Sequence, residues 1–202
     1  MYDNRDRLKT KATPEGTLTY TYDAHGNVLT INSSNTNGAS MTYTYDVLNR
    51  LATVTDNRIA AQGGPSSATT YSYDPTGNLT GTADPNGVAT ANVFDPLNRL
   101  TQTCSATGAS SSSQACTAGT RLSSFAYTLG LAGNRTAVTE LSTRHVAYGY
   151  DADYVLTSET ITGDPPPASN NGSETYTYDV VGNRKTLTST VPALPGQPDV
   201  LL

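Results

Sequence analysis

Seven aspartates recur at one place in a short repeated pattern, and a regular row of carboxylates could bind cations or serve in acid catalysis. They are Asp3, Asp23, Asp46, Asp74, Asp95, Asp151 and Asp179. Each precedes a turn, where a side-chain acceptor for backbone N–H groups is needed for structural reasons. A glycosidase needs two carboxylates in different environments, one of them with a raised pKa. Identical copies provide identical environments, so we expect this row to be structural.

Other residue types that commonly carry chemistry are poorly placed. His25 falls in a variable turn position, and His145 lies beside Arg144 with no second His four residues on and no cluster at metal-ligand spacing. The serines lie in low-complexity stretches without a Gly-x-Ser-x-Gly elbow. Residues 151–153 have the Asp-x-Asp form of a glycosyltransferase metal pair, but they belong to a copy of the repeat. We predict no catalytic residue, no metal site and no cofactor, and a protein that is not an enzyme.

The two cysteines bracket a Ser-rich stretch. Eleven residues separate Cys104 from Cys116. A disulfide that closes this stretch is one reading if the chain is extracellular, and loop closure of that size contributes about 3 kcal/mol. Two free thiols are the alternative, because the geometry cannot be judged from the sequence.

The repeated pattern is a strand, a turn and a strand, and residues 19–29 show it best. Tyr20 and Tyr22 are two apart and so share one face of a strand. Asp23 to Gly26 turn the chain, because an Asx side chain caps a turn and Gly accepts a positive φ. The copies begin at Tyr2, Tyr22, Tyr45, Tyr73, Phe94, Tyr127, Tyr150 and Tyr178. The copy at Tyr127 lacks the Asp and carries two extra residues. About eight hairpins with loops of changing length are predicted.

The motif residues are expected to have structural roles. They are Tyr20, Tyr22, Asp23, Gly26, Asn27, Tyr43, Tyr45, Asp46, Arg50, Tyr71, Tyr73, Asp74, Gly77, Asn78, Phe94, Asp95, Arg99, Tyr148, Tyr150, Asp151, Tyr176, Tyr178, Asp179, Gly182, Asn183 and Arg184. The tyrosines would form the core by stacking as cross-strand pairs, because a single hairpin cannot bury its own face. The alternative is glycan binding, since an exposed Tyr can stack on a sugar ring.

Six arginines are predicted to share one structural position just after the turn. They are Arg5, Arg7, Arg50, Arg99, Arg135 and Arg184. Because these arginines are spread along the chain and the net charge is −5, we predict no nucleic-acid binding, which needs a basic cluster on one face. No apolar run approaches the roughly 20 residues that span a bilayer, and the first five residues have no apolar signal core.

The organisation of the motif resembles a known family. Tyr-Asp-x-x-Gly-Asn-Arg-Leu in tandem, preceded by Tyr-x-Tyr-Asp, resembles the YD repeats of the Rhs (rearrangement hotspot) family, which also occur in bacterial wall-associated proteins, toxin-complex shell subunits and teneurins. The resemblance covers residues 2 to about 188. It implies a large β-sheet that spirals into a hollow shell, secreted or displayed at the cell surface, which encloses a C-terminal toxin in many bacterial members. No stretch matches such a toxin or the protease segment that releases it.

Residues 1–190 are therefore predicted to form one YD-repeat β-sheet domain, and residues 191–202 a Pro-rich tail or linker. Ser-, Asn-, Gly- and Pro-rich insertions are expected along one side of the sheet, at residues 32–40, 61–67, 105–115 and 163–172. Because the chain begins inside a motif copy, we expect it to be a segment of a longer protein.

The predicted fold is all-β, an antiparallel YD-repeat hairpin ribbon that forms part of a spiralling β-solenoid or shell. The predicted function is that of a non-catalytic wall segment of a secreted or cell-surface bacterial protein, and its partners would be flanking repeats and an effector domain. The alternative is an adhesion module that binds carbohydrate or protein at the cell surface, with a surface glycan as its ligand. That alternative predicts a patch of Tyr or Arg left exposed on one face.

Overall fold

The computed structural model describes residues 1–58, 67–108, 116–117, 119–166 and 170–192. In this part of the chain, fifteen strands form a single antiparallel sheet in which every strand pairs with its neighbours in sequence. The strands are β1 (Thr10–Thr13), β2 (Gly16–Tyr22), β3 (Val28–Ser33), β4 (Ser40–Tyr45), β5 (Leu51–Asp56), β6 (Ala68–Tyr73), β7 (Leu79–Ala83), β8 (Val88–Phe94), β9 (Leu100–Thr107), β10 (Thr120–Leu129), β11 (Arg135–Glu140), β12 (His145–Tyr150), β13 (Leu156–Thr162), β14 (Gly172–Tyr178) and β15 (Arg184–Ser189). The predicted antiparallel hairpin ribbon is confirmed.

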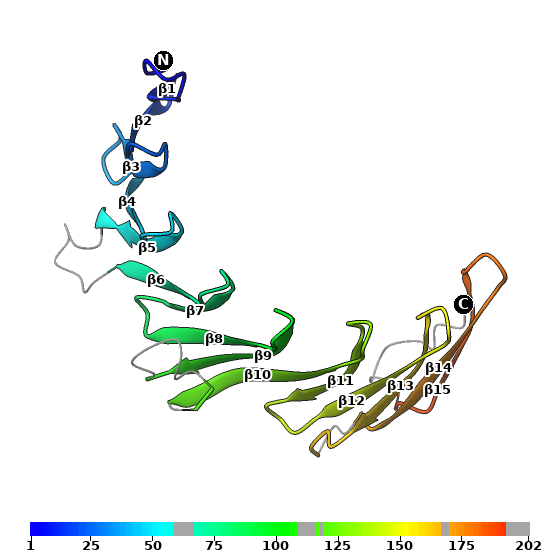
Figure 1. The fold of residues 1–202 in the computed structure, drawn as a ribbon. Helices are drawn as coiled ribbons and strands as arrows, with labels where there is room; N and C mark the ends of the chain where they lie inside the picture. Colours follow the sequence, from blue (N-terminus) through cyan, green and yellow to red (C-terminus); the bar gives the residue numbers. More distant parts are fainter. Residues whose placement is uncertain (59–66, 109–115, 118, 167–169, 193–202) are drawn as a thin grey trace.

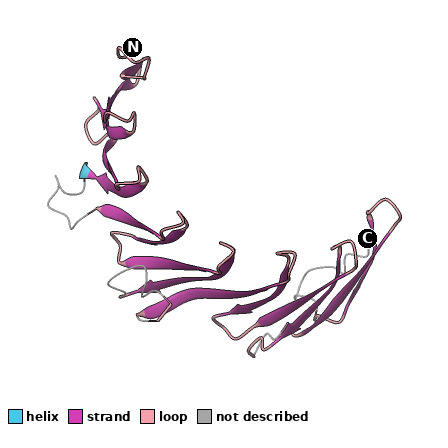
Figure 2. Ribbon diagram, in the orientation of Figure 1, coloured by secondary structure: helices cyan, strands magenta, loops and turns pink. Residues whose placement is uncertain are grey.

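The sheet is one layer thick and bends into an open arc, with β1 at one end and β15 at the other (Figure 1). Strands account for almost all of its regular structure, and a short helical piece follows β5 (Figure 2). No described helix is long and apolar enough to cross a membrane. A sheet without a second layer can bury little of its surface, so its stability depends on contacts between neighbouring hairpins.

The motif turns all lie on one edge of the sheet. Because the strands meander in sequence order, every second connection falls on the same edge, and the motif turns are the connections β2–β3, β4–β5, β6–β7, β8–β9, β10–β11, β12–β13 and β14–β15. In Figure 1 this edge follows the inner side of the arc, and the other connections follow the outer side. Two of the predicted insertions fall largely within residues 59–66 and 109–115, and the proposed tail falls largely within 193–202, all outside the described residues.

A β-bulge adjoins the motif turn in each of these seven hairpins. In β2–β3 the pairing shifts between Thr21 and Tyr22, so that Tyr22 lies opposite Val28 while Thr21 lies opposite Thr30. The same shift occurs in β4–β5, β6–β7, β8–β9, β10–β11, β12–β13 and β14–β15. A bulge adds local twist and bends the strand, and its recurrence at each turn fits the regular bend of the ribbon.

The expectation that the copy near Tyr127 carries two extra residues is wrong. The bulge of β10–β11 lies between Thr128 and Leu129, and Leu129 pairs with Arg135. Leu129 therefore occupies the place of the second Tyr, and Gly130 the place of the Asp. Tyr127 corresponds to the first Tyr of the motif, so the copy is complete in length.

The face of the sheet opposite the tyrosines contains a buried cluster at β8 and β9. Ala89, Ala91 and Ala106 are at most 4% exposed, and Cys116 packs against them. A disulfide joins Cys116 to Cys104 of β9. The disulfide therefore fixes part of the β9–β10 connection over these small side chains, and this cover explains why alanines are among the most buried residues of a single-layer sheet.

A second buried cluster lies on the tyrosine face farther along the chain. Val138, Val146 and Ile161 pair across β11, β12 and β13 and are at most 8% exposed. Tyr127, Tyr148 and also Val191 pack against this cluster. Val191, in the stretch that we expected to be a tail, therefore contributes to the packing of the sheet.

Candidate functional site

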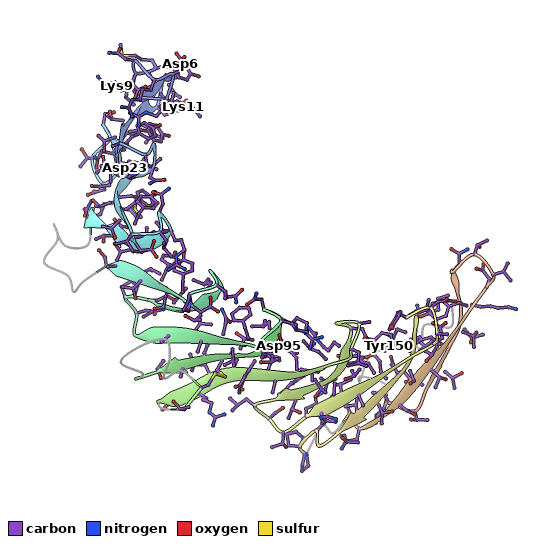
Figure 3. The ribbon with its side chains drawn as sticks, viewed as in Figure 1. Asp6, Lys9, Lys11, Asp23, Asp95 and Tyr150 are labelled. Carbon is purple, nitrogen blue, oxygen red and sulfur yellow. A yellow bond between two sulfur atoms is a disulfide. The ribbon has the colours of Figure 1, made fainter. Side chains whose placement is uncertain are left out.

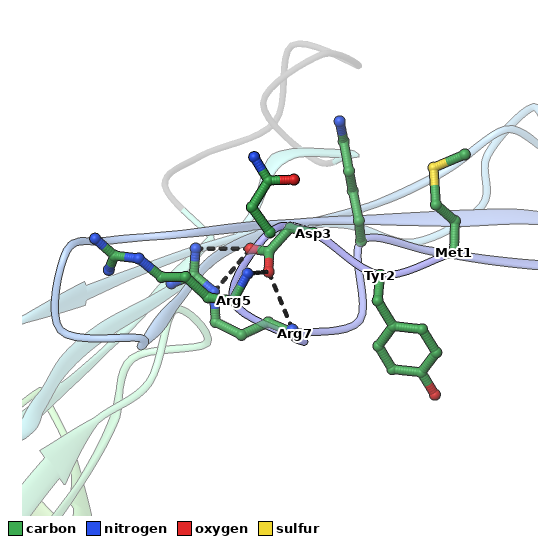
Figure 4. A pocket seen from close by; sticks show the side chains of 7 residues that line it. Met1, Tyr2, Asp3, Arg5 and Arg7 are labelled. Atoms are coloured by element: carbon green, nitrogen blue, oxygen red, sulfur yellow. Dashed lines mark hydrogen bonds and ion pairs between the residues drawn. The ribbon is translucent and has the colours of Figure 1, made fainter.

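The Asp of each motif turn caps its own turn. In the first turn, Oδ1 of Asp3 accepts the backbone N–H of Arg5 at 2.8 Å and that of Arg7 at 3.0 Å (Figure 4). The N–H groups two and four residues on are bound in the same way by Asp46, Asp74, Asp95, Asp151 and Asp179. Asp23 accepts from Gly26 and Asn27 instead. The carboxylates thus replace water at turn N–H groups that lack a backbone partner.

These hydrogen bonds hold the carboxylates in the ionised form. The side-chain hydrogen bond from Arg7, with the backbone N–H bonds, lowers the pKa of Asp3 to about 2. Burial raises the pKa of Asp74, but hydrogen bonds from Asn78 and Thr76 outweigh it and lower that pKa to about 2. In the remaining affected turns, hydrogen bonds likewise outweigh burial and lower the pKa, at Asp23, Asp46, Asp95 and Asp179. A general acid needs a raised pKa, so the row is suited to hold turns and not to donate protons.

The residue four after the Asp alternates between Arg and Asn along the ribbon. It is Arg7, Asn27, Arg50, Asn78, Arg99, Asn134, Val155 and Asn183 in successive turns. Each Arg places Nε and Nη2 on Oδ2 of its own Asp, at 2.8 and 2.7 Å in the first turn and at 2.7 Å in the two others. In the Asn-type turns that begin with an Asp, the Asn donates from Nδ2 to Oδ2 of that Asp. Both residue types therefore complete the cap.

The arginines at this position also bridge to the next motif turn. Nη1 of Arg50 donates to the backbone oxygen of Asp74 at 3.0 Å, and its guanidinium lies 4.5 Å from the ring centre of Tyr73. Arg7 makes the equivalent bond to Asp23 and lies over Tyr22. Arg99 bonds to Gly130, where Leu129 replaces the Tyr.

Asparagines supply the links between these bridges. Nδ2 of Asn78 donates to Oδ1 of Asn98 in the following turn at 2.8 Å, and Asn27 bonds to Asn49 in the same way. Hydrogen bonds therefore connect six successive turns, from Asp3 to Gly130. Among the described residues, no side-chain bond of this kind joins the Gly130 turn to the Asp151 turn, or the Asp151 turn to the Asp179 turn.

The prediction of a single position for six arginines is wrong. Arg135 and Arg184 lie five residues after the turn begins and stack on the first Tyr of their own hairpins, at 4.1 Å from Tyr127 and 5.8 Å from Tyr176. Arg5 lies in the second position and donates to the backbone of Ala24. The sequence contained the signal that separates these groups, because turns of the form Asp-x-x-Asp/Asn-Arg alternate with turns of the form Asp-x-x-Gly-Asn in the first five copies.

The second Tyr of each motif connects its hairpin to the one before. Its hydroxyl donates to the backbone oxygen of the first paired residue after the preceding turn: Tyr22 to Leu8, Tyr45 to Val28, Tyr73 to Leu51, Tyr150 to Arg135 and Tyr178 to Leu156, at 2.6 to 3.0 Å. Phe94 has no hydroxyl, and Asn92 of the same strand donates to Leu79 instead. The contact is thus kept by a different side chain.

The recurrent Tyr, Asp and Arg contacts form a ladder that runs along one edge of the sheet, where Asp23, Asp95 and Tyr150 lie (Figure 3). A family model described as Teneurin YD-shell matches residues 1–107, slightly more than half of the chain. The chain belongs to this family. The resemblance drawn from the motif is therefore confirmed.

Solved structures with the same fold come from Tc toxins. The crystal structure of TcdB2–TccC3–Cdc42 superposes with a TM-score of 0.65 at 20% identity, covering 88% of this chain and 9% of that one. A Tc holotoxin pore of Photorhabdus luminescens superposes with a TM-score of 0.64 at 20% identity, covering 95% and 10%. The chain spans about a tenth of these proteins, and at this identity the likeness establishes the fold alone. No curated protein matches the sequence.

The tyrosines of this YD-shell segment are not the core that we expected. All ten are half-buried, and the buried apolar residues of the described chain are smaller side chains. The first Tyr of a motif lies opposite a non-aromatic residue, as Tyr20 lies opposite Ile31 and Tyr43 opposite Val54. The rings therefore do not form cross-strand Tyr pairs. The rings are therefore only partly covered, and the second Tyr of a motif contributes a hydrogen bond through its hydroxyl.

A depression with a mixed lining lies on the tyrosine face. It has a volume of about 270 Å³ and lies over β10 to β13. Val138 and Val146 form its apolar part, and Phe125, Tyr127, Arg135, Glu140, Arg144, Tyr148 and Glu159 supply aromatic and charged groups. Arg144 is paired with Glu140 at 2.5 Å. In the described part of the chain, no group of three or more His, Cys, Asp or Glu could hold a metal ion.

Proposed function

We propose that this chain is a non-catalytic wall segment of a secreted or cell-surface bacterial YD-shell protein, and that the shell encloses or displays an effector domain outside this chain. The observation that carries the proposal is the ladder along the motif edge. In it Arg7, Arg50 and Arg99 each bind the Asp of their own turn and donate a hydrogen bond to the backbone of the next turn. Such contacts join neighbours in an array without forming a reactive centre. The arc in Figure 1 has the bend that a wall requires.

Three further observations support the proposal. Membership of the Teneurin YD-shell family and the fold shared with Tc toxin chains favour a shell role over catalysis. The lowered pKa values of the motif carboxylates disfavour acid catalysis. The Cys104–Cys116 disulfide favours an oxidising compartment, in agreement with secretion.

Protease protection tests the enclosure. The chain would be expressed with its flanking repeats and effector domain, and digestion of the effector would be followed in time. Replacing Arg7, Arg50 and Arg99 together by Ala should open the wall and expose the effector to digestion. Arg135→Ala is the matched control, because this arginine stacks on Tyr127 within its own hairpin and bridges no turns. If the effector is digested as fast in the native protein as in the triple variant, enclosure is refuted.

A binding role at the cell surface is the second candidate, and the depression over β10 to β13 favours it. Half-exposed rings of Tyr127 and Tyr148 beside Arg and Glu side chains suit a sugar ring, which has an apolar face and polar rim. Glycan-array binding by the folded chain, lost in Tyr148→Ala while the circular dichroism spectrum stays unchanged, would support this role. A folded chain that binds nothing on the array would count against it.

A further inference from the structure

The Asp151 turn breaks the alternation of Arg and Asn at the fourth position. After the Asn134 turn an Arg is due, but Val155 stands there, preceded by Tyr154 in place of the Asp or Asn of the other Arg-type turns. Tyr154 still has the positive φ of that position, 61°, compared with 65° at Asn49 and 60° at Asn98. The backbone of an Arg-type turn is thus kept while the bridging side chain is missing.

The groups that bind the guanidinium elsewhere are all present at this turn. In the Asp46 turn those groups are Oδ2 of Asp46, the backbone oxygen of Asp74 and the ring of Tyr73. Their counterparts here are Oδ2 of Asp151, the backbone oxygen of Asp179 and the ring of Tyr178. Oδ1 of Asp151 caps its turn as usual, and the Tyr178 hydroxyl bonds to Leu156 as Tyr73 bonds to Leu51.

These acceptors are accessible. The Asp3 and Asp46 side chains, each of which forms an ion pair with an Arg, are 22% and 26% exposed, whereas Asp151 is an exposed residue. Among the described side chains, none donates to Oδ2 of Asp151 and no guanidinium lies over Tyr178. Arg184, on the adjacent strand, stacks instead on Tyr176. Val155 is too short to reach past its own turn.

We propose that the Asp151 turn is a binding site for a guanidinium group, supplied in trans by an arginine side chain of a polypeptide partner. The repeats themselves identify the ligand, because the same three groups bind Arg7 and Arg50 in cis. A guanidinium is preferred over an ammonium, since it is planar, donates two bonds to a carboxylate and stacks on an aromatic ring. Exposed Asp153 in the same turn adds negative charge without occupying the site.

Peptide titration of the purified chain, followed by ¹H–¹⁵N NMR, tests the site. The probe is acetyl-Gly-Arg-Gly-amide, and the amides of Asp153 and Val155 report on it because they donate to the Asp151 carboxylate. Weak, saturable binding that shifts these two amides is expected. The citrulline peptide, which has the same shape without the charge, should cause no saturable shift. The lysine peptide should bind about tenfold more weakly, because it lacks the bidentate fork.

Variants distinguish this site from general attraction of a cation. Val155→Arg should fill the site in cis, abolish peptide binding and raise the melting temperature, because it restores the bridge to Asp179. Ala152→Arg is the matched control, since it adds the same charge in the same turn and should leave saturable binding in place. Asp151→Asn should weaken peptide binding about tenfold. This variant tests the site even if Val155→Arg does not fold. Undiminished binding by folded Val155→Arg, or equal shifts with the citrulline peptide, would overturn the proposal.

Discussion

The motif carboxylates stabilise the turns only while they are ionised. The pKa of Asp3 and of Asp74 is about 2 in the folded chain, below the ordinary value of about 3.9. A carboxyl group with a lowered folded-state pKa stabilises the fold fully above its unfolded pKa and loses this contribution as pH falls through the folded one. The row should therefore make the fold sensitive to acid between about pH 4 and pH 2.

We predict that the free energy of unfolding, measured with urea at a series of pH values, is flat near neutrality and falls steeply between about pH 4 and pH 2. Asp74→Asn should be less stable at pH 7 and should show a smaller fall, because one of the linked carboxylates is gone. An equal fall in the variant would show that the Asp74 carboxylate does not contribute to the acid dependence.

The third residue after the Asp requires a positive φ, and the chain itself indicates which substitutions it tolerates. Gly77 has a φ of 98°, while Asn49 and Asn98 occupy the equivalent position at 65° and 60°. No atom lies within 4 Å of the Cβ that a side chain would add at Gly77, so only the backbone conformation opposes substitution.

We predict that Gly77→Val lowers the free energy of unfolding by about 2 kcal/mol, because a β-branched residue is strained at positive φ. Gly77→Asn is the matched control and should cost well under half as much. Chemical denaturation of the two variants measures the difference. Similar losses would mean that the turn relaxes to a negative φ.

Sequence reasoning identified the residues of the ladder but not how they are joined. Tyr, Asp and Gly at fixed spacing predict a strand and a turn, since these preferences are local. The partner of each bridging side chain lies in another repeat, 24 residues away for Arg50 and Asp74. That partner depends on how successive hairpins pair with one another, which the residues of a single motif do not specify. The sequence distinguishes Arg50 from Arg135 by their places, four and five residues after the turn begins, but it does not show that Arg50 reaches the next turn whereas Arg135 stacks within its own hairpin.

At the level of the elements, a side-chain hydrogen bond from the second Tyr of the motif, or from a substitute for it, joins a hairpin to the preceding strand near the motif edge, in addition to the Arg and Asn bonds between turns. Tyr73 of β6 donates to Leu51 of β5 at 3.0 Å. In β8 the bond comes from Asn92, which lies two residues before Phe94. The replacement of a phenol by an amide indicates that the bond to the neighbouring strand matters more than the ring.

We predict that Tyr73→Phe lowers the free energy of unfolding by about 1 kcal/mol, the usual net contribution of one hydrogen bond. Tyr71→Phe is the control, because the structure gives its hydroxyl no hydrogen bond within the described residues, and it should be nearly neutral. In the β8 hairpin, Asn92→Ala should be destabilising and Phe94→Tyr should restore stability in that background. Failure of this rescue would show that the hydroxyl and amide are not equivalent.

For the molecule as a whole, the repeat predicted the order and direction of the strands, because consecutive hairpins with short turns can only meander. The distribution of burial could not be predicted from the same pattern. The most buried residues depend on cover from outside the repeat: the Cys116 segment over Ala89 and Ala91, and Val191 beside Ile161. Neither the Cys116 segment nor Val191 belongs to the motif. The motif therefore did not indicate where the buried residues lie, and the core of stacked tyrosines that it suggested is absent.

This uneven burial implies that the ribbon does not open as one unit. In an array whose members contact only their neighbours, local stability follows the local interfaces. The buried alanine cluster lies in β8 and β9, whereas every residue of β15 is exposed and the Asp151 turn between β12 and β13 lacks a bridging arginine. Native-state hydrogen exchange should therefore find the slowest amides in β8 and β9, while β15 and β14 exchange much faster through opening of the C-terminal end.

Val155→Arg should slow exchange in β14 and β15 and leave β8 unchanged, because the new bridge acts only between neighbouring turns. Uniform protection along the chain would contradict this order and indicate that the sheet unfolds cooperatively.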